Sequence, residues 1–325
     1  MSIAALLCAL SCTREVLYTP EDAEDKLILN AQIDASAEHH MAWIGISKTS
    51  TIAKVPDATL TCSVNGKDVS MGVLDESLSE RSVQSCYQFD AELHPGDIVR
   101  LAAKGAGLSA YAEVSVPDTT GRMLAVDTLR TDSGMRFTAH VRDYATDRNY
   151  YRIRLVTKTS QTYLYSGEWS SWEDHALEVA VTHKNDPILD GRIGSSEGDD
   201  FFGLGSSSNL HCIFTDRLFA EGNADIIFTV DDRELSRVYV NRYYDQLRAT
   251  CSASVSLISM DLAEYEYLNI QNILYDNGYD ASDLLEPVTV PTNVVDGTGF
   301  VGIFMPSTVD VKLPDISLQR GGYFF

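Results

Sequence analysis

Hydrophobic and polar residues alternate along much of the chain, which is the pattern of half-buried β-strands. Residues 58–64 (Ala-Thr-Leu-Thr-Cys-Ser-Val) alternate without a break and lead into Asn65-Gly66, a dipeptide typical of tight hairpin turns. Residues 83–93 alternate in the same way, and His94-Pro95-Gly96-Asp97 then turns the chain. In the first part of the chain, strands are predicted over residues 27–33, 42–46, 58–64, 83–93, 98–102 and 111–116.

The number and spacing of these strands predict an immunoglobulin-like β-sandwich over residues 26–118. Pro117-Asp118-Thr119-Thr120-Gly121 is expected to form the boundary with a second domain. Residues 119–325 have the same alternating texture and are predicted to form a larger, β-sandwich-like domain. Its strands are expected over residues 135–141, 150–157, 177–181, 211–215, 226–230, 238–244 and 247–258.

The period changes to that of a helix once, which predicts one helix near residues 260–275. Ser259 or Asp261 is expected to cap its start, and Asn277-Gly278 to end it. The apolar stripe of this helix consists of Ala263, Tyr267, Ile270 and Leu274. The predicted fold class is therefore mainly β, with two domains and one helix.

The composition is that of a folded protein, with 44% hydrophobic and 22% charged residues. The charge is strongly negative, because 47 acidic residues outnumber 25 basic ones and leave −22. Such a surface repels phosphate backbones and anionic lipid headgroups, so nucleic-acid binding is not expected.

The first residues indicate export. Residues 3–10 are apolar and resemble the end of a signal-peptide core, although no Lys or Arg precedes them. Ser11-Cys12 follows in the manner of a bacterial lipobox. Residues 1–12 are therefore predicted to be a signal peptide ending at Cys12, whose thiol would carry the lipid. A buried N-terminal strand is the alternative, and Cys8 is a weaker candidate for lipid attachment.

Residues 13–25 are polar and acidic, as expected of a tether between a lipid anchor and a folded domain. The expected location is the outer membrane, with the protein facing either the periplasm or the cell surface. In an exported protein, the four remaining cysteines are candidates for two disulfides, Cys62–Cys86 and Cys212–Cys251. All four could instead be small buried apolar residues.

The end of the chain contains motifs that resemble a known family. It reads Leu285-Glu286-Pro287-Val288, then Thr292-Asn293-Val294, then residues 297–304 (Gly-Thr-Gly-Phe-Val-Gly-Ile-Phe). Phe214-Thr215-Asp216 with Phe219 adds a second short motif. Together these resemble the Gram-negative lipoprotein family known as domain of unknown function 4249.

This resemblance covers nearly the whole chain, and one departure is the Phe300-Val301 step before Gly302, which many members lack. The resemblance implies an envelope lipoprotein with an immunoglobulin-like first domain. Members of the family are often encoded beside TonB-dependent outer-membrane receptors, so the expected partner is such a receptor, or a nutrient that the receptor imports. The resemblance implies no reaction, catalytic residue or cofactor.

Two tryptophans make residues 167–174 the strongest candidate for binding. Trp169 and Trp172 lie three residues apart between acidic residues, and could form a platform that stacks on sugar rings or on a partner protein. The alternative is that both cover the edge of the second domain.

Other motifs are weaker. Gly194-Ser195-Ser196-Glu197-Gly198 matches the hydrolase nucleophile elbow, but lacks the buried strand and the helix that an elbow requires. Acidic residues at 186–200 could hold calcium, although their spacing is not that of an EF-hand. The seven histidines include no HExxH motif, and His39-His40 is expected in a turn. No metal, cofactor or catalytic residue is therefore predicted, and the expected function is that of a non-catalytic, lipid-anchored binding protein.

Overall fold

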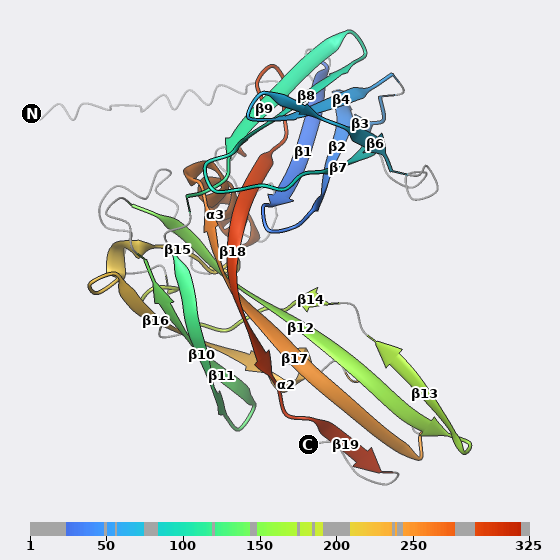
Figure 1. The fold of residues 1–325 in the computed structure, drawn as a ribbon, viewed down its shortest axis with the longest axis vertical. Coiled ribbons are helices and arrows are strands. Elements are labelled where there is room, and N and C mark those ends of the chain that lie inside the picture. Colours follow the sequence, from blue (N-terminus) through green and yellow to red (C-terminus); the bar gives the residue numbers. More distant parts are fainter. Residues whose placement is uncertain are drawn as a thin grey trace, which may run out of the picture.

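The computed structural model describes residues 24–48, 51–55, 57–74, 84–118, 121–143, 148–173, 176–183, 186–190, 209–235, 238, 243–276 and 290–319. The fold is mainly β, as predicted. Figure 1 shows two lobes set at an angle, with the strand β18 running from one into the other. Within the described part of the chain, no helix is both long and apolar enough to cross a bilayer.

The first lobe is formed by two sheets that share one core. Strands β5, β4, β8 and β9 form one sheet, and β1, β2, β3, β7 and β6 belong to the other. Alternate residues point between the sheets, so Leu29 of β1 and Leu101 of β8 are both fully buried in the common core. The strands are β1 Lys26–Asp34, β2 His39–Lys48, β3 Thr51–Ala53, β4 Thr59–Val64, β5 Lys67–Val69, β6 Met71–Val73, β7 Ser85–Asp90, β8 Ile98–Gly105 and β9 Leu108–Ser115.

The predicted turn at Asn65-Gly66 is present, with positive φ at both residues. His39-His40 does not lie in a turn as predicted, because β2 already begins at His39. His40 is buried there, and its Nε2 lies 3.0 Å from the carbonyl oxygen of Ala91.

The end of the chain joins the two lobes. The first residues of β18 (Val301–Lys312) pair in parallel with β1, from Ala31 opposite Val301 to Asp34 opposite Phe304. The same strand then pairs antiparallel with β17 (Gln246–Met260). One sheet therefore continues through both lobes, in the order β13-β12-β17-β18-β1-β2-β7-β6. Val294, Val301 and Ile303 complete the core of the first lobe.

The second lobe packs a three-stranded sheet against the long strands β12 (Tyr150–Tyr165) and β17. The three-stranded sheet consists of β10 Arg122–Arg130, β11 Gly134–Arg142 and β16 Asn223–Asp231. Phe137 and Phe228 stack in the core with ring centroids 5.3 Å apart. The shorter elements are β13 Glu168–Glu173, β14 Leu177–Glu178, β15 Ile213–Thr215, η2 Asp216–Leu218, α2 Asp232–Leu235 and β19 Ile316–Gln319. The expected strand over 238–244 lies mostly outside the described residues.

The helix α3 (Leu262–Asp276) lies where the periodicity predicted it. It begins after Asp261, whose Oδ1 accepts a hydrogen bond of 2.8 Å from the backbone N–H of Glu264. Leu268 and Ile270 are buried, and the ring of Tyr267 stacks on Phe300 at 4.2 Å. The helix thus covers the junction between the lobes (Figure 1).

Candidate functional site

The residues of the tail motif hold the tail against β1. Gly299 has a φ of +105°, and an added β-carbon would lie 2.4 Å from the carbonyl oxygen of Leu29. Asn293 donates a hydrogen bond of 2.6 Å to the carbonyl of Val301 and accepts one of 3.0 Å from its N–H. Gly299 thus permits a close approach of the tail to β1, and Asn293 closes the loop that leads into β18, so the role of both residues in this structure is architectural.

The second motif is architectural as well. Phe214 and Phe219 lie against the ring of Tyr151, with centroids 5.8 and 6.1 Å away. The hydroxyl of Tyr151 donates a hydrogen bond of 2.7 Å to Asp143, and the backbone N–H of Asn149 donates one of 3.2 Å to Asp216. Burial raises the pKa of Asp216. The motif therefore organises the core of the second lobe.

All four cysteines within the described residues are free thiols, so neither predicted disulfide is formed in the structure. Cys62 lies in β4 and Cys86 in β7, which belong to different sheets. Cys251 lies opposite Thr159, whose Oγ1 is 3.8 Å from its Sγ. Burial raises the thiol pKa of Cys62 and of Cys212 to about 12, which makes both poor nucleophiles.

Several predicted sites lie outside the described residues: Cys12, the Gly194–Gly198 motif and most of the acidic segment 186–200. The described member Asp186 is buried and accepts backbone hydrogen bonds from Ile188, Leu189 and Ile227, so its carboxylate is used structurally. Among the residues that the structure describes, no three His, Cys, Asp or Glu side chains are placed to hold a metal ion.

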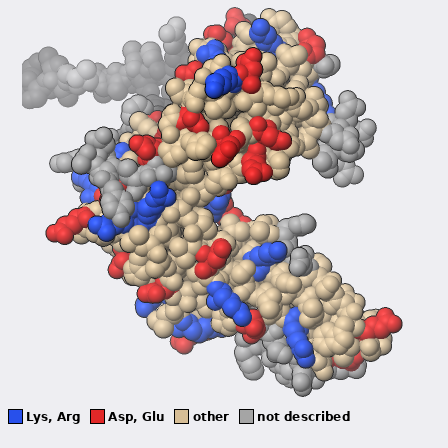
Figure 2. Space-filling model, in the orientation of Figure 1, with Lys and Arg blue, Asp and Glu red and all other residues tan. Residues whose placement is uncertain are grey.

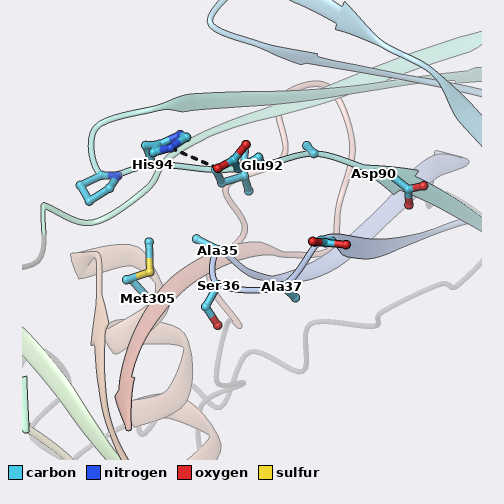
Figure 3. A pocket seen from close by; sticks show the side chains of 11 residues that line it. Ala35, Ser36, Ala37, Asp90, Glu92, His94 and Met305 are labelled. Atoms are coloured by element: carbon cyan, nitrogen blue, oxygen red, sulfur yellow. Dashed lines mark ion pairs between the residues drawn. The ribbon is translucent and has the colours of Figure 1, made fainter.

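A hollow of about 680 Å³ lies on the first lobe, next to the junction (Figure 3). It is lined by Glu38, Asp90, Glu92, His94 and Met305 together with small residues of the same loops. Acidic residues gather on the part of the first lobe that faces the second (Figure 2).

Two acidic residues that line this hollow, Asp90 and Glu92, each lie close to a histidine at the surface. Nδ1 of His39 lies 2.8 Å from Asp90, and Nε2 of His94 lies 3.6 Å from Glu92. The hydrogen bond between His39 and Asp90 raises the pKa of the histidine and lowers that of the carboxyl. All four side chains of these pairs are more than half exposed, so the pairs contribute little to stability.

The most distinctive surface is the far end of the second lobe, which we call the aromatic arm. It consists of residues 159–173, which include the end of β12 and all of β13, and of residues 243–251, which include the start of β17. Tyr165, Trp169, Trp172 and Tyr243 are 50%, 51%, 40% and 53% exposed. No other Phe, Trp or Tyr whose exposure the structure describes is as exposed. The sequence had marked Trp169 and Trp172, but not the two tyrosines that the fold places beside them.

The two tryptophans lie on opposite faces of the arm. Trp169 stands opposite Leu164 and Trp172 opposite Gln161, an odd spacing in a strand where faces alternate. The guanidinium of Arg248 lies 5.3 Å from the ring centroid of Trp169, and Tyr163 stacks on Tyr244 at 4.3 Å. The arm therefore presents an aromatic surface on each face. The single platform expected from the spacing is absent, because residues three apart share a face in a helix and not in a strand.

Comparisons with known proteins identify the family of the chain. A search among curated proteins finds no match. One similar crystal structure is that of a DUF4785 family protein from Legionella pneumophila subsp. pneumophila, with 13% sequence identity and a TM-score of 0.23. The match covers 74% of this chain and 54% of that one, so the chain spans about half the length of that protein. A family model matches residues 13–310, and the chain accordingly belongs to the family described as domain of unknown function DUF4249.

Proposed function

We propose that this protein is a non-catalytic, lipid-anchored protein of the bacterial outer membrane that binds another protein through its aromatic arm. The observation that carries the proposal is the concentration of exposed aromatic side chains on the arm. Tryptophan, tyrosine and arginine are the residues most enriched among the energetically dominant contacts of protein interfaces. An exposed indole costs solvation free energy in the free protein, and a partner that covers it removes that cost.

The anchor and the partner are proposed from the sequence. Ser11-Cys12 follows an apolar run as in a lipobox, and Cys12 would carry the lipid. Members of the lipoprotein family that the sequence resembles are often encoded beside TonB-dependent receptors, which makes such a receptor the first candidate partner. The low affinity expected between a chain of charge −22 and nucleic acid or anionic lipid also favours a protein partner.

Co-purification from detergent-solubilised membranes tests the proposal. Full-length, tagged protein should recover a TonB-dependent receptor, and Trp169→Ala or Trp172→Ala should lower the recovered amount at least tenfold. Leu129→Ala is the matched control, because Leu129 is 53% exposed on β10, away from the arm. Recovery of the protein alone in every detergent, or equal recovery by all variants, contradicts the proposal.

A glycan-binding function is the second candidate, since the exposed faces of Trp169 and Trp172 could each stack on a sugar ring. Because the two indoles lie on opposite faces, each would form a separate site. Binding on a glycan array that is lost in Trp172→Ala, with the receptor absent from the purified material, would favour this candidate. An array without signal excludes it.

A further inference from the structure

The strand β13 forms a free edge of the large sheet. The order of strands ends at β13, which pairs with β12 and with no other strand in the described part of the chain. Residues 168–172 are all exposed. In Figure 1 the β12–β13 hairpin lies at the end of the second lobe that is farthest from the first lobe. The residues that the structure describes therefore leave this edge accessible to a partner.

The hairpin geometry fixes which backbone groups point outward. Ser166 and Gly167 form a two-residue turn with φ of +51° and +85°, which makes Tyr165 and Glu168 a hydrogen-bonded pair. Hydrogen-bonded and non-hydrogen-bonded pairs alternate along an antiparallel ladder. The N–H and C=O groups of residues 169, 171 and 173 therefore point away from β12. One hydrogen bond on the other side of β12 agrees with this alternation. The N–H of Asp245 donates it to the carbonyl of Leu164 over 2.8 Å, so the backbone groups of Leu164 point away from β13.

Among the described residues, the middle of this edge lacks the features that usually block strand addition. Natural edge strands are commonly protected by proline, by lysine, by a β-bulge or by a covering segment. Residues 168–173 (Glu-Trp-Ser-Ser-Trp-Glu) contain neither proline nor lysine, and their pairing with β12 has no shift in register. A six-residue strand with one unpaired edge and two exposed tryptophans is suited to pair with a further strand.

The charge of β13 indicates which kind of segment would pair with it. The strand has an acidic residue at each end, Glu168 and Glu173, and no basic residue. A second copy of the chain would add two more acidic residues at the same edge and a further charge of −22, so self-pairing is opposed by repulsion. An extended segment with Lys or Arg near its ends would instead complement both acidic residues.

We propose that β13 binds an extended, basic segment of another protein by β-strand addition, with the outward backbone groups of residues 169, 171 and 173 as its hydrogen-bonding template. The inference rests on the proposed function, since it specifies how the aromatic arm would engage a partner protein. Trp169 on one face and Trp172 on the other would then pack against alternate side chains of the added strand.

Ser171→Pro is the variant that separates strand addition from other ways of binding. Proline removes the outward N–H of Ser171 and no bond to β12, so the hairpin is expected to stay folded. Ser171→Thr keeps that N–H and is the matched control. The probe is a phage-displayed library of random 12-residue peptides, selected in parallel on the wild-type full chain and on both variants.

Strand addition predicts that the wild-type chain and Ser171→Thr enrich peptides with alternating β-branched residues and terminal Lys or Arg. The affinity of these peptides for Ser171→Pro should be at least tenfold lower. The affinity for the wild-type chain should also fall at least tenfold when every second backbone amide of the peptide is methylated, for one of the two alternating sets of amides. Amide exchange at residues 169 and 171 should slow at least tenfold in the complex. Peptides that bind Ser171→Pro equally, or no enrichment on the wild-type chain, overturn the inference.

Two further outcomes overturn it in favour of another occupant. A dimer in light scattering that Ser171→Pro abolishes would identify a second copy. A blue shift of tryptophan emission on phosphatidylethanolamine–phosphatidylglycerol vesicles, without peptide binding, would identify a membrane surface. If Trp169→Ala lowers receptor recovery while Ser171→Pro does not, strand addition fails and the proposed function stands. If neither substitution matters, both fail.

Discussion

The carboxyl group of Glu264 lies against Gly302, where α3 meets β18. A β-carbon at position 302 would be 3.1 Å from Oε2 of Glu264, and this buried oxygen has no hydrogen-bond partner among the described residues. Burial, and secondarily the carboxylate of Asp261, raises the pKa of Glu264 to about 7. An ionisable residue thus lies buried at the junction of the two lobes, covered by the tail that joins them.

Glu264→Gln should make the protein more stable at pH 8 than the wild type. Because the folded-state pKa is raised from 4.5 to about 7, the carboxyl favours folding fully below pH 4.5. That contribution is lost as the pH rises toward 7, and amounts to about 3 kcal/mol at roughly 1.4 kcal/mol per pKa unit. Urea unfolding of both proteins at pH 5 and pH 8 measures the effect. A stability difference that is the same at both pH values contradicts the prediction.

Gly299→Ala should destabilise the protein strongly, because a side chain at a φ of +105° is strained and the β-carbon would meet the backbone oxygen of Leu29 at 2.4 Å. We expect a loss of about 2–4 kcal/mol in the free energy of unfolding, measured by thermal and urea unfolding. Gly72→Ala is the control, since no atom lies within 4 Å of its added β-carbon. An equal loss in the free energy of unfolding for the two variants would contradict the close contact between the tail and β1.

Tyr151→Phe should cost about 1–3 kcal/mol of stability. The substitution removes the buried hydrogen bond of 2.7 Å from the hydroxyl to Asp143 and leaves the ring stacking intact. Tyr165→Phe serves as the control, because the side chain of Tyr165 is half exposed. Unfolding in urea compares the two variants, and a loss below about 0.5 kcal/mol for Tyr151→Phe would refute the assigned role of this hydroxyl.

The thiols should differ in reactivity in the folded protein. Cys62, Cys212 and Cys251 are buried, whereas Cys86 is half-buried, so iodoacetamide at pH 8 should label Cys86 first. Peptide mass spectrometry after short labelling times measures this order, and labelling in urea should reach all four. A Cys62–Cys86 or Cys212–Cys251 linkage in the purified protein would contradict the free thiols of the structure.

Local alternation was sufficient to predict most strands of the first lobe and the helix α3, because burial of one face imposes a period on the sequence itself. It missed β10, in which only Met123 is buried and several apolar residues are exposed, so the alternation is weak. It also missed β13, whose residues are exposed on both faces. A strand assignment there would have predicted that Trp169 and Trp172 face opposite ways.

The pairing of strands could not be read from the sequence in the same way. Alternation shows which face of a strand is buried, but not which neighbour buries it. The contact of β18 with β1 joins residues about 270 positions apart. It depends on Gly299 approaching the backbone of Leu29 and on the hydrogen bond of 3.0 Å from the N–H of Phe300 to Oδ1 of Asn30, and the sequence does not place these residues near each other.

The sequence by itself therefore determined the fold class, the position of the helix, the family motifs and the charge. The tertiary structure alone decided that the tail closes the first lobe, that the cysteines remain apart in the structure, that the exposed aromatic residues gather on one arm and that this arm ends in an unpaired edge. The physical reason is that solvent exposure and strand neighbours result from packing between distant segments, whereas periodicity records only the environment along a single strand or helix.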